Sequence, residues 1–127
     1  MEIPSPLTFH IMVNYLPAIS MFRWRVQELG KMPMTFSMLP QHFSSIAFYI
    51  EQFSNGREVK PLEYFEICKE DNGVALHIWE FEHIPGAVNL KGPLRLSLAN
   101  EQFDAFVTYI KKVYDSADSG DIFEKKN

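Results

Sequence analysis

The chain has 127 residues, of which 46% are hydrophobic and 22% are charged, and its net charge is -4 at pH 7. These values are typical of one soluble globular domain and exclude a wholly disordered chain. The acidic balance argues against a general polyanion binder, because counterion release rewards clustered lysine and arginine, but it leaves room for a local basic groove.

Cysteine content and hydropathy indicate the compartment. The single cysteine, Cys68, excludes an intramolecular disulfide. No apolar run approaches the roughly 20 residues that span a bilayer, and Met1 to Pro6 lacks a signal-peptide pattern. We therefore expect an intracellular, cytoplasmic protein without membrane insertion.

The first half of the chain alternates apolar and polar residues and then changes to helical spacing near Pro40. Three strands are expected at about residues 7–16, 19–29 and 33–39. A helix follows and ends before Asn55 and Gly56, which are typical of a helix C-terminus. Its predicted apolar face comprises Phe43, Ile46, Ala47, Ile50 and Phe53.

The second half follows the same order after a connection from Gly56 to Leu62. Strands are expected at about 63–70, 74–84 and 92–98, with a tight turn at Asp71, Asn72 and Gly73. A helix from about Asn100 to Asp115 follows, and residues 116–127 are expected to be a flexible tail. The apolar stripe of this helix comprises Phe103, Phe106, Val107, Ile110 and Val113.

The two halves resemble each other in sequence. Lys31, Pro33, Ser37, Phe43, Tyr49 and Ile50 recur 60 positions later as Lys91, Pro93, Ser97, Phe103, Tyr109 and Ile110, and a spacing of 55 pairs Trp24 with Trp79. We infer a tandem duplication of a strand-strand-strand-helix unit, with repeats at about 7–55 and 63–115 in a single domain, 1–115. Because each unit is too small to bury both faces of its sheet, we predict an α+β fold: an antiparallel-sheet pseudo-dimer covered by two helices.

Strand periodicity predicts which face of each sheet meets the helices. Phe22, Trp24 and Val26, with the counterparts His77, Trp79 and Phe81, are expected to face them. The outer face then carries Met21, Arg23, Arg25 and Gln27 in the first unit and Leu76, Ile78, Glu80 and Glu82 in the second. The two tryptophans are either base-stacking platforms or core anchors, and their repetition favours the core.

The basic residues Arg23, Arg25 and Arg95 have two interpretations. They form a phosphate-contacting patch, with Tyr64 available for stacking on bases, or they are solvated and paired with Glu80 and Glu82.

No catalytic or metal-binding pattern is evident. His77 and His83 lie on one side of a strand, but they are about 20 Å apart along it, so one ion cannot bind both. The sequence has no glycine-rich phosphate loop, no nucleophile elbow and no Cys and His dyad with an orienting partner. We therefore expect a non-enzymatic protein without metal or cofactor.

The segment from Val74 to Tyr114 carries a family resemblance. Its Pro85 and Gly86 turn, Lys91 and Gly92, and the step Leu96, Ser97, Leu98 into Glu101, Gln102 and Phe103 resemble the transcriptional positive-coactivator family of single-strand DNA binders. Two such units in tandem are similar in plan to the Whirly and Pur-alpha proteins. Those families use four strands per unit, whereas this sequence predicts three, and Glu80 and Glu82 stand where a nucleic-acid face prefers basic or aromatic residues.

The resemblance implies a small protein that binds single-stranded DNA or RNA, and a regulatory role is compatible with it. Lys91 and Arg95 match basic positions of the family, and their copies are Lys31 and Thr35. The candidate nucleic-acid-binding residues are Arg23, Arg25, Lys31, Lys91 and Arg95. The alternative is a protein-interaction module or regulatory subunit that uses an exposed apolar patch of Met21, Leu76 and Ile78 or a sheet edge. The oligomeric state stays open.

Overall fold

A computed structural model describes residues 2–3, 9–28, 30, 32–84 and 87–119 of the chain. It has two antiparallel sheets and two helices. The predicted α+β class with two helix-covered sheets is therefore confirmed, while the duplication itself stays a prediction.

The first sheet has four strands in the order β1-β2-β3-β4. These are β1 (Glu2–Ile3), β2 (Phe9–Leu16), β3 (Met21–Glu28) and β4 (Met34–Met38), and α1 (Pro40–Ser54) follows them. The alternation in β3 places Phe22, Trp24 and Val26 on the buried face, as predicted. The short edge strand β1 was not predicted, because two residues are too few to show a period.

The second sheet has three strands in the order β5-β6-β7. These are β5 (Phe65–Glu70), β6 (Gly73–Ile84) and β7 (Ala87–Ala99), followed by α2 (Asn100–Ser119). The predicted tight turn joins β5 to β6, and a Cβ added at Gly73 would lie 1.9 Å from the carbonyl oxygen of Leu98, so this position requires glycine. Helix α2 continues past the predicted end at Asp115, where Ala117 is buried.

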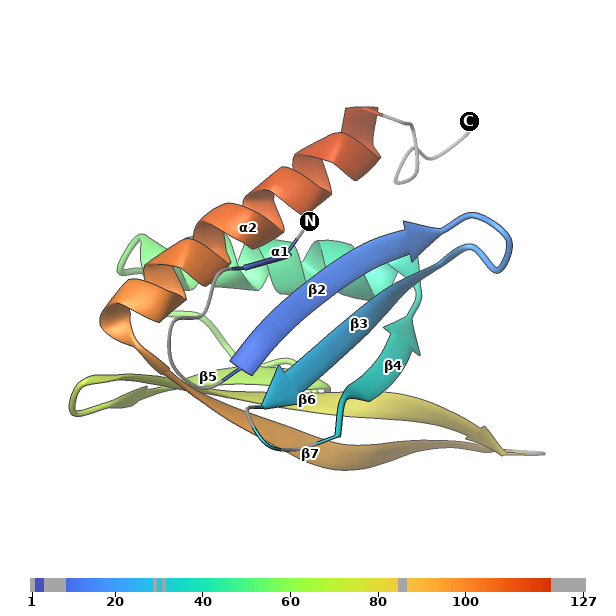
Figure 1. Ribbon diagram of the computed structural model, residues 1–127, viewed down its shortest axis with the longest axis horizontal. Helices are drawn as coiled ribbons and strands as arrows, with labels where there is room; N and C mark the ends of the chain where they lie inside the picture. Colours follow the sequence, from blue (N-terminus) through green and yellow to red (C-terminus); the bar gives the residue numbers. More distant parts are fainter. Residues whose placement is uncertain (1, 4–8, 29, 31, 85–86, 120–127) are drawn as a thin grey trace.

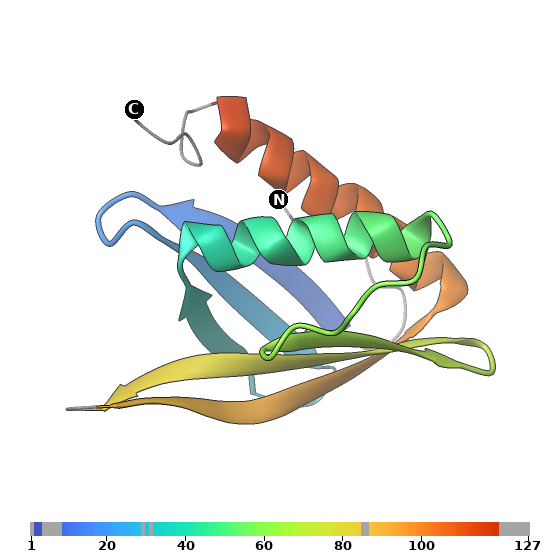
Figure 2. The same ribbon diagram turned by 180° about the vertical axis from the view of Figure 1, so that it is seen from behind.

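Both helices lie on the same side of the first sheet, and the second sheet runs beneath them (Figures 1 and 2). Helix α1 contacts β3 of the first sheet and β5 of the second, and α2 contacts strands of both sheets as well as α1. One hydrophobic core therefore fills the space between the sheets and the helices. No helix within the described residues is long and apolar enough to cross a membrane.

The inner face of β6 differs from the prediction. Val74, Leu76 and Ile78 are buried, so the expected exposure of Leu76 and Ile78 was wrong. The strand register shows the same error. Trp24 pairs with Phe36 in the first sheet, but Leu96, which lies 60 positions after Phe36, pairs with Leu76 and not with Trp79.

A β-bulge interrupts the pairing of β6 with β7 just beyond these residues. Ile78 pairs with Leu94 and Glu80 with Lys91, so Gly92 and Pro93 of β7 together lie opposite Trp79. Phe81, beyond the bulge, packs on the rings of His42 and Tyr64, at 4.3 and 5.1 Å between centroids.

Two buried tyrosines connect each helix to a strand of the other half of the chain. The Tyr109 hydroxyl of α2 accepts a hydrogen bond from the Val13 N–H at 2.8 Å and donates one to the Val13 carbonyl at 3.3 Å. Within the described residues β1 pairs with Ile11 and Met12, and this hydroxyl satisfies the backbone of Val13, the next residue of β2.

Tyr49 of α1 makes the corresponding contact with the edge strand β5. Its hydroxyl accepts a hydrogen bond from the Ile67 N–H at 3.1 Å. Burial raises the pKa of Tyr49 above its ordinary value, and nearby Glu66 acts in the same direction, while the bond from Ile67 lowers it. The neutral phenol is thus the form that the folded chain favours.

We predict that Tyr109→Phe destabilises the protein more than Tyr49→Phe. The first change removes two hydrogen bonds and leaves both backbone groups of Val13 buried without their partner, at a cost of about 1–3 kcal/mol. The second removes a single bond to Ile67. Urea denaturation measures both, with Tyr15→Phe as the control, since the half-buried ring of Tyr15 packs on Phe22 in either form. Equal stability of the wild type and the Tyr109→Phe variant would contradict this account.

Candidate nucleic-acid interface

The outer face of the first sheet brings two of the predicted basic residues together. Arg23 and Arg25 are two positions apart on β3, so both point away from the helices, and both are exposed. In register, Arg23 lies between Asn14 and Ser37, and Arg25 lies between Met12 and Thr35. Most of these neighbours are small or hydrogen-bonding side chains.

The charged side chains that the structure describes on this face are basic, although the chain as a whole is acidic. No carboxylate occurs among the side chains of this face that the structure describes. In register, Met12 lies between Glu2 of the edge strand and Arg25. Two exposed guanidinium groups on a rigid central strand can each grip a phosphate or carboxylate in a bidentate manner.

Of the remaining predicted basic residues, Lys31 lies outside the described residues. Lys91 and Arg95 are exposed on β7 of the second sheet, where Lys91 pairs in register with Glu80. Arg95 forms an ion pair with Glu70 and donates a hydrogen bond to the Ser97 hydroxyl at 3.2 Å. The neighbouring carboxylates offset the positive charge of this second group, so the four described residues do not form one patch.

The aromatic residues also differ from their predicted roles. Tyr64, expected to be available for stacking, packs on Phe81 and His42. Trp24 is fully buried, so its predicted core role is confirmed. Trp79 is only partly buried and its ring lies 6.2 Å from that of His77, so the core role predicted for Trp79 was wrong.

The outer face of the second sheet gathers three side chains that can ligate a metal. The Cys68 Sγ and the Glu66 Oε1 each lie 3.9 Å from the His77 Nδ1, and the ligand atoms of all three residues are within 4.8 Å of one another. Burial and the Glu66 carboxylate raise the pKa of the Cys68 thiol, and Arg95 opposes them. Sequence reasoning compared His77 only with His83 and missed this cluster.

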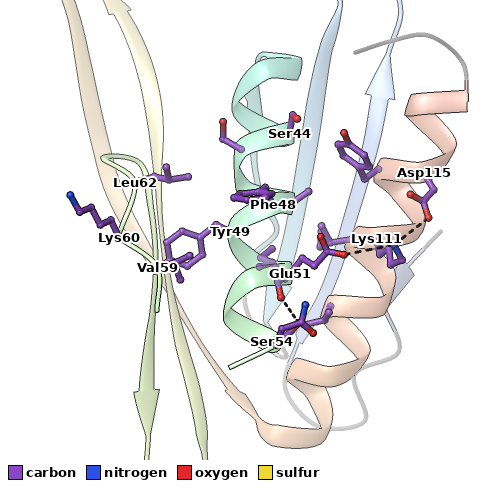
Figure 3. Close-up of a pocket in the computed structure, with 17 residues that line it drawn as sticks. Ser44, Phe48, Tyr49, Glu51, Ser54, Val59, Lys60, Leu62, Lys111 and Asp115 are labelled. Carbon is purple, nitrogen blue, oxygen red and sulfur yellow. Dashed lines mark hydrogen bonds and ion pairs between the residues drawn. The ribbon is translucent and has the colours of Figure 1, made fainter. Parts of the chain in front are cut away.

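A groove of about 810 Å³ opens between the two helices and the chain that follows α1. Figure 3 shows Val59 and Leu62 of that segment beside α1, with Glu51 and Lys111 facing each other across the helices at 3.9 Å. Phe48 lines the groove and is 63% exposed, which is unusual for so large an apolar side chain.

No family model, curated protein or solved structure matches this chain. Its function therefore has to be argued from its own surfaces.

We predict that the two tryptophans differ in their accessibility to solvent. Acrylamide should quench the fluorescence of Trp79 on the outer face, and the Trp79→Phe variant should retain only the weakly quenched, blue-shifted emission of Trp24 in the core. Trp24→Phe is the matched variant, in which the remaining emission is readily quenched. Equal quenching of the two single-tryptophan proteins would contradict the placement of Trp79 on the outer face of β6.

Proposed function

We propose that this protein binds single-stranded nucleic acid across the outer face of its first sheet, with Arg23 and Arg25 holding the phosphate backbone. The observation that supports this role is the pair of exposed guanidinium groups on a face without a described carboxylate. Asn14, Thr35 and Ser37 flank the pair and offer hydrogen bonds to sugar and phosphate oxygens.

The geometry favours backbone contacts over base stacking. Among the described side chains of this outer face the imidazole of His10 is the one aromatic ring, with no phenylalanine, tyrosine or tryptophan, and Trp79 belongs to the other sheet. Phosphate contacts position a nucleic acid without reading its sequence. The proposed binding is therefore electrostatic and sequence-tolerant, and Lys91 and Arg95, next to Glu80 and Glu70, contribute little to it.

Two phosphate contacts predict a specific salt dependence. For single strands the slope of log K against log salt is about -0.7 per phosphate neutralised, so the wild type should give about -1.4. Arg25→Gln should reduce the slope to about -0.7, because one contact is lost, and should weaken binding to every sequence alike. Fluorescence anisotropy with labelled single-stranded DNA, single-stranded RNA and duplex measures these values at several salt concentrations.

Arg57→Gln is the charge-matched control. Arg57 is exposed in the segment after α1, where its guanidinium donates to the Gln52 side chain at 3.0 Å, and it lies on neither outer face. The proposal expects this variant to bind as the wild type does. Absence of binding at low salt, or equal weakening by Arg57→Gln and Arg25→Gln, would contradict it.

The groove between the helices favours the second candidate, a protein-interaction module. The version based on exposed Leu76 and Ile78 is excluded by their burial. The exposed Phe48 and the apolar wall formed with Val59 and Val107 suit an apolar side chain or helix of a partner.

If the occupant of this groove is a second copy of the chain, the wild type should associate as its concentration rises, and Phe48→Glu should remain monomeric because a buried unpaired carboxylate is costly. Sedimentation equilibrium measures this association. Ile19→Glu is the control, since Ile19 is 50% exposed in the turn between β2 and β3, away from the groove. A wild type that is monomeric at every concentration would contradict self-association through Phe48.

A further inference from the structure

Strand geometry explains why Glu66, Cys68 and His77 converge on the outer face of the second sheet. Glu66 and Cys68 are two positions apart on β5 and therefore lie on the same face. His77 on β6 pairs directly with Glu66, and the partner of Cys68 is the small residue Ala75. The imidazole thus lies within reach of both neighbours, with its Nδ1 3.9 Å from each of their ligand atoms.

We propose that Glu66, Cys68 and His77 form a binding site for a divalent first-row transition metal, with zinc the best match. A thiolate, an imidazole and a carboxylate together are the donors that zinc accepts in proteins. This site is separate from the basic face of the first sheet, and neither proposal depends on the other.

The distances suit such an ion. Zinc lies about 2.3 Å from sulfur and about 2.0–2.2 Å from nitrogen or oxygen, which places tetrahedral ligand atoms about 3.3–3.6 Å from one another. The two separations of 3.9 Å need to close by only a few tenths of an ångström. Rotation of the Glu66 and Cys68 side chains can supply this movement while the ladder that holds His77 stays unchanged.

The charge near the cluster also suits a divalent cation. The Glu66 carboxylate and a metal-bound Cys68 thiolate supply two negative charges. Arg95 pairs with His77 across the sheet, and its guanidinium is engaged by Glu70 and Ser97. This ion pair removes most of the repulsion that a free arginine would exert on a metal.

The site offers three protein ligands and access to solvent. All three side chains are partly buried, neither in the core nor fully exposed. A fourth position is therefore open to water or to an external ligand, which is the arrangement of exchangeable and catalytic zinc sites, whereas structural sites have four protein ligands.

Cobalt titration of the full chain, purified without a histidine tag, tests the proposal. Co²⁺ should bind with one-to-one stoichiometry and give the visible bands of a tetrahedral site together with a near-ultraviolet thiolate-to-cobalt band, and Zn²⁺ should displace it. Cys68→Ser should abolish the thiolate band. His77→Gln should weaken binding at least about tenfold, since even changes to groups that only orient a ligand cost that much.

His10→Gln is the matched control, because His10 is exposed on the outer face of the other sheet. It should leave the spectrum and the affinity unchanged. Thermal unfolding gives a second measure that is independent of the spectrum: Zn²⁺ should raise the Tm of the wild type and of His10→Gln but not that of Cys68→Ser. A cobalt spectrum without the thiolate band, or a Cys68→Ser variant that binds and is stabilised like the wild type, would overturn the proposal.

Discussion

The hydroxyls of Tyr49 and Tyr109 each bond a helix to the sheet of the other half of the chain, and the rest of the structure depends on these two connections. A thin sheet covered by a single helix has too little buried surface to be stable alone. The core crosses between the halves in the same way, because the Phe106 ring of α2 lies 6.3 Å from that of Trp24 in β3, and the Phe53 ring of α1 lies 5.8 Å from that of Phe103 in α2. Neither half can therefore keep its inner face buried without the other.

This shared core leaves the outer faces of the two sheets available for binding, and they differ in chemistry. On the first, the exposed charges that the structure describes are those of Arg23 and Arg25, flanked mainly by side chains that form hydrogen bonds. On the second, Arg95 is paired with Glu70, and the metal-ligating atoms of Glu66, Cys68 and His77 lie close together. A basic face suits a polyanion, whereas a cluster of sulfur, nitrogen and oxygen donors suits a soft or borderline metal. One small domain thus presents two surfaces with separate chemical preferences.

Much of the fold could be predicted because burial on one face of a strand or helix imposes a period on the sequence. Strands β2, β3 and β4, both helices and the exposed positions of Arg23 and Arg25 follow from that period alone. The prediction failed in β6, because both sides of that strand carry large apolar residues and the period alone does not decide which side is buried: Leu76 and Ile78 are buried, whereas Trp79 on the other side is only partly buried. Because Leu76 and Ile78 are buried, they do not form the exposed apolar patch that the sequence predicted.

The sequence by itself determined the class of fold, the order of the elements and the basic outer face of β3, since each of these depends on residues close together along the chain. Only the tertiary structure decided the inner face of β6, the tyrosine ties between the halves, and the meeting of Glu66, Cys68 and His77. The physical reason is that these features depend on cross-strand register and on contacts such as that of Tyr109 with Val13, 96 positions apart. Periodicity is a local property and carries no information about which distant residues will share a hydrogen bond or a ligand.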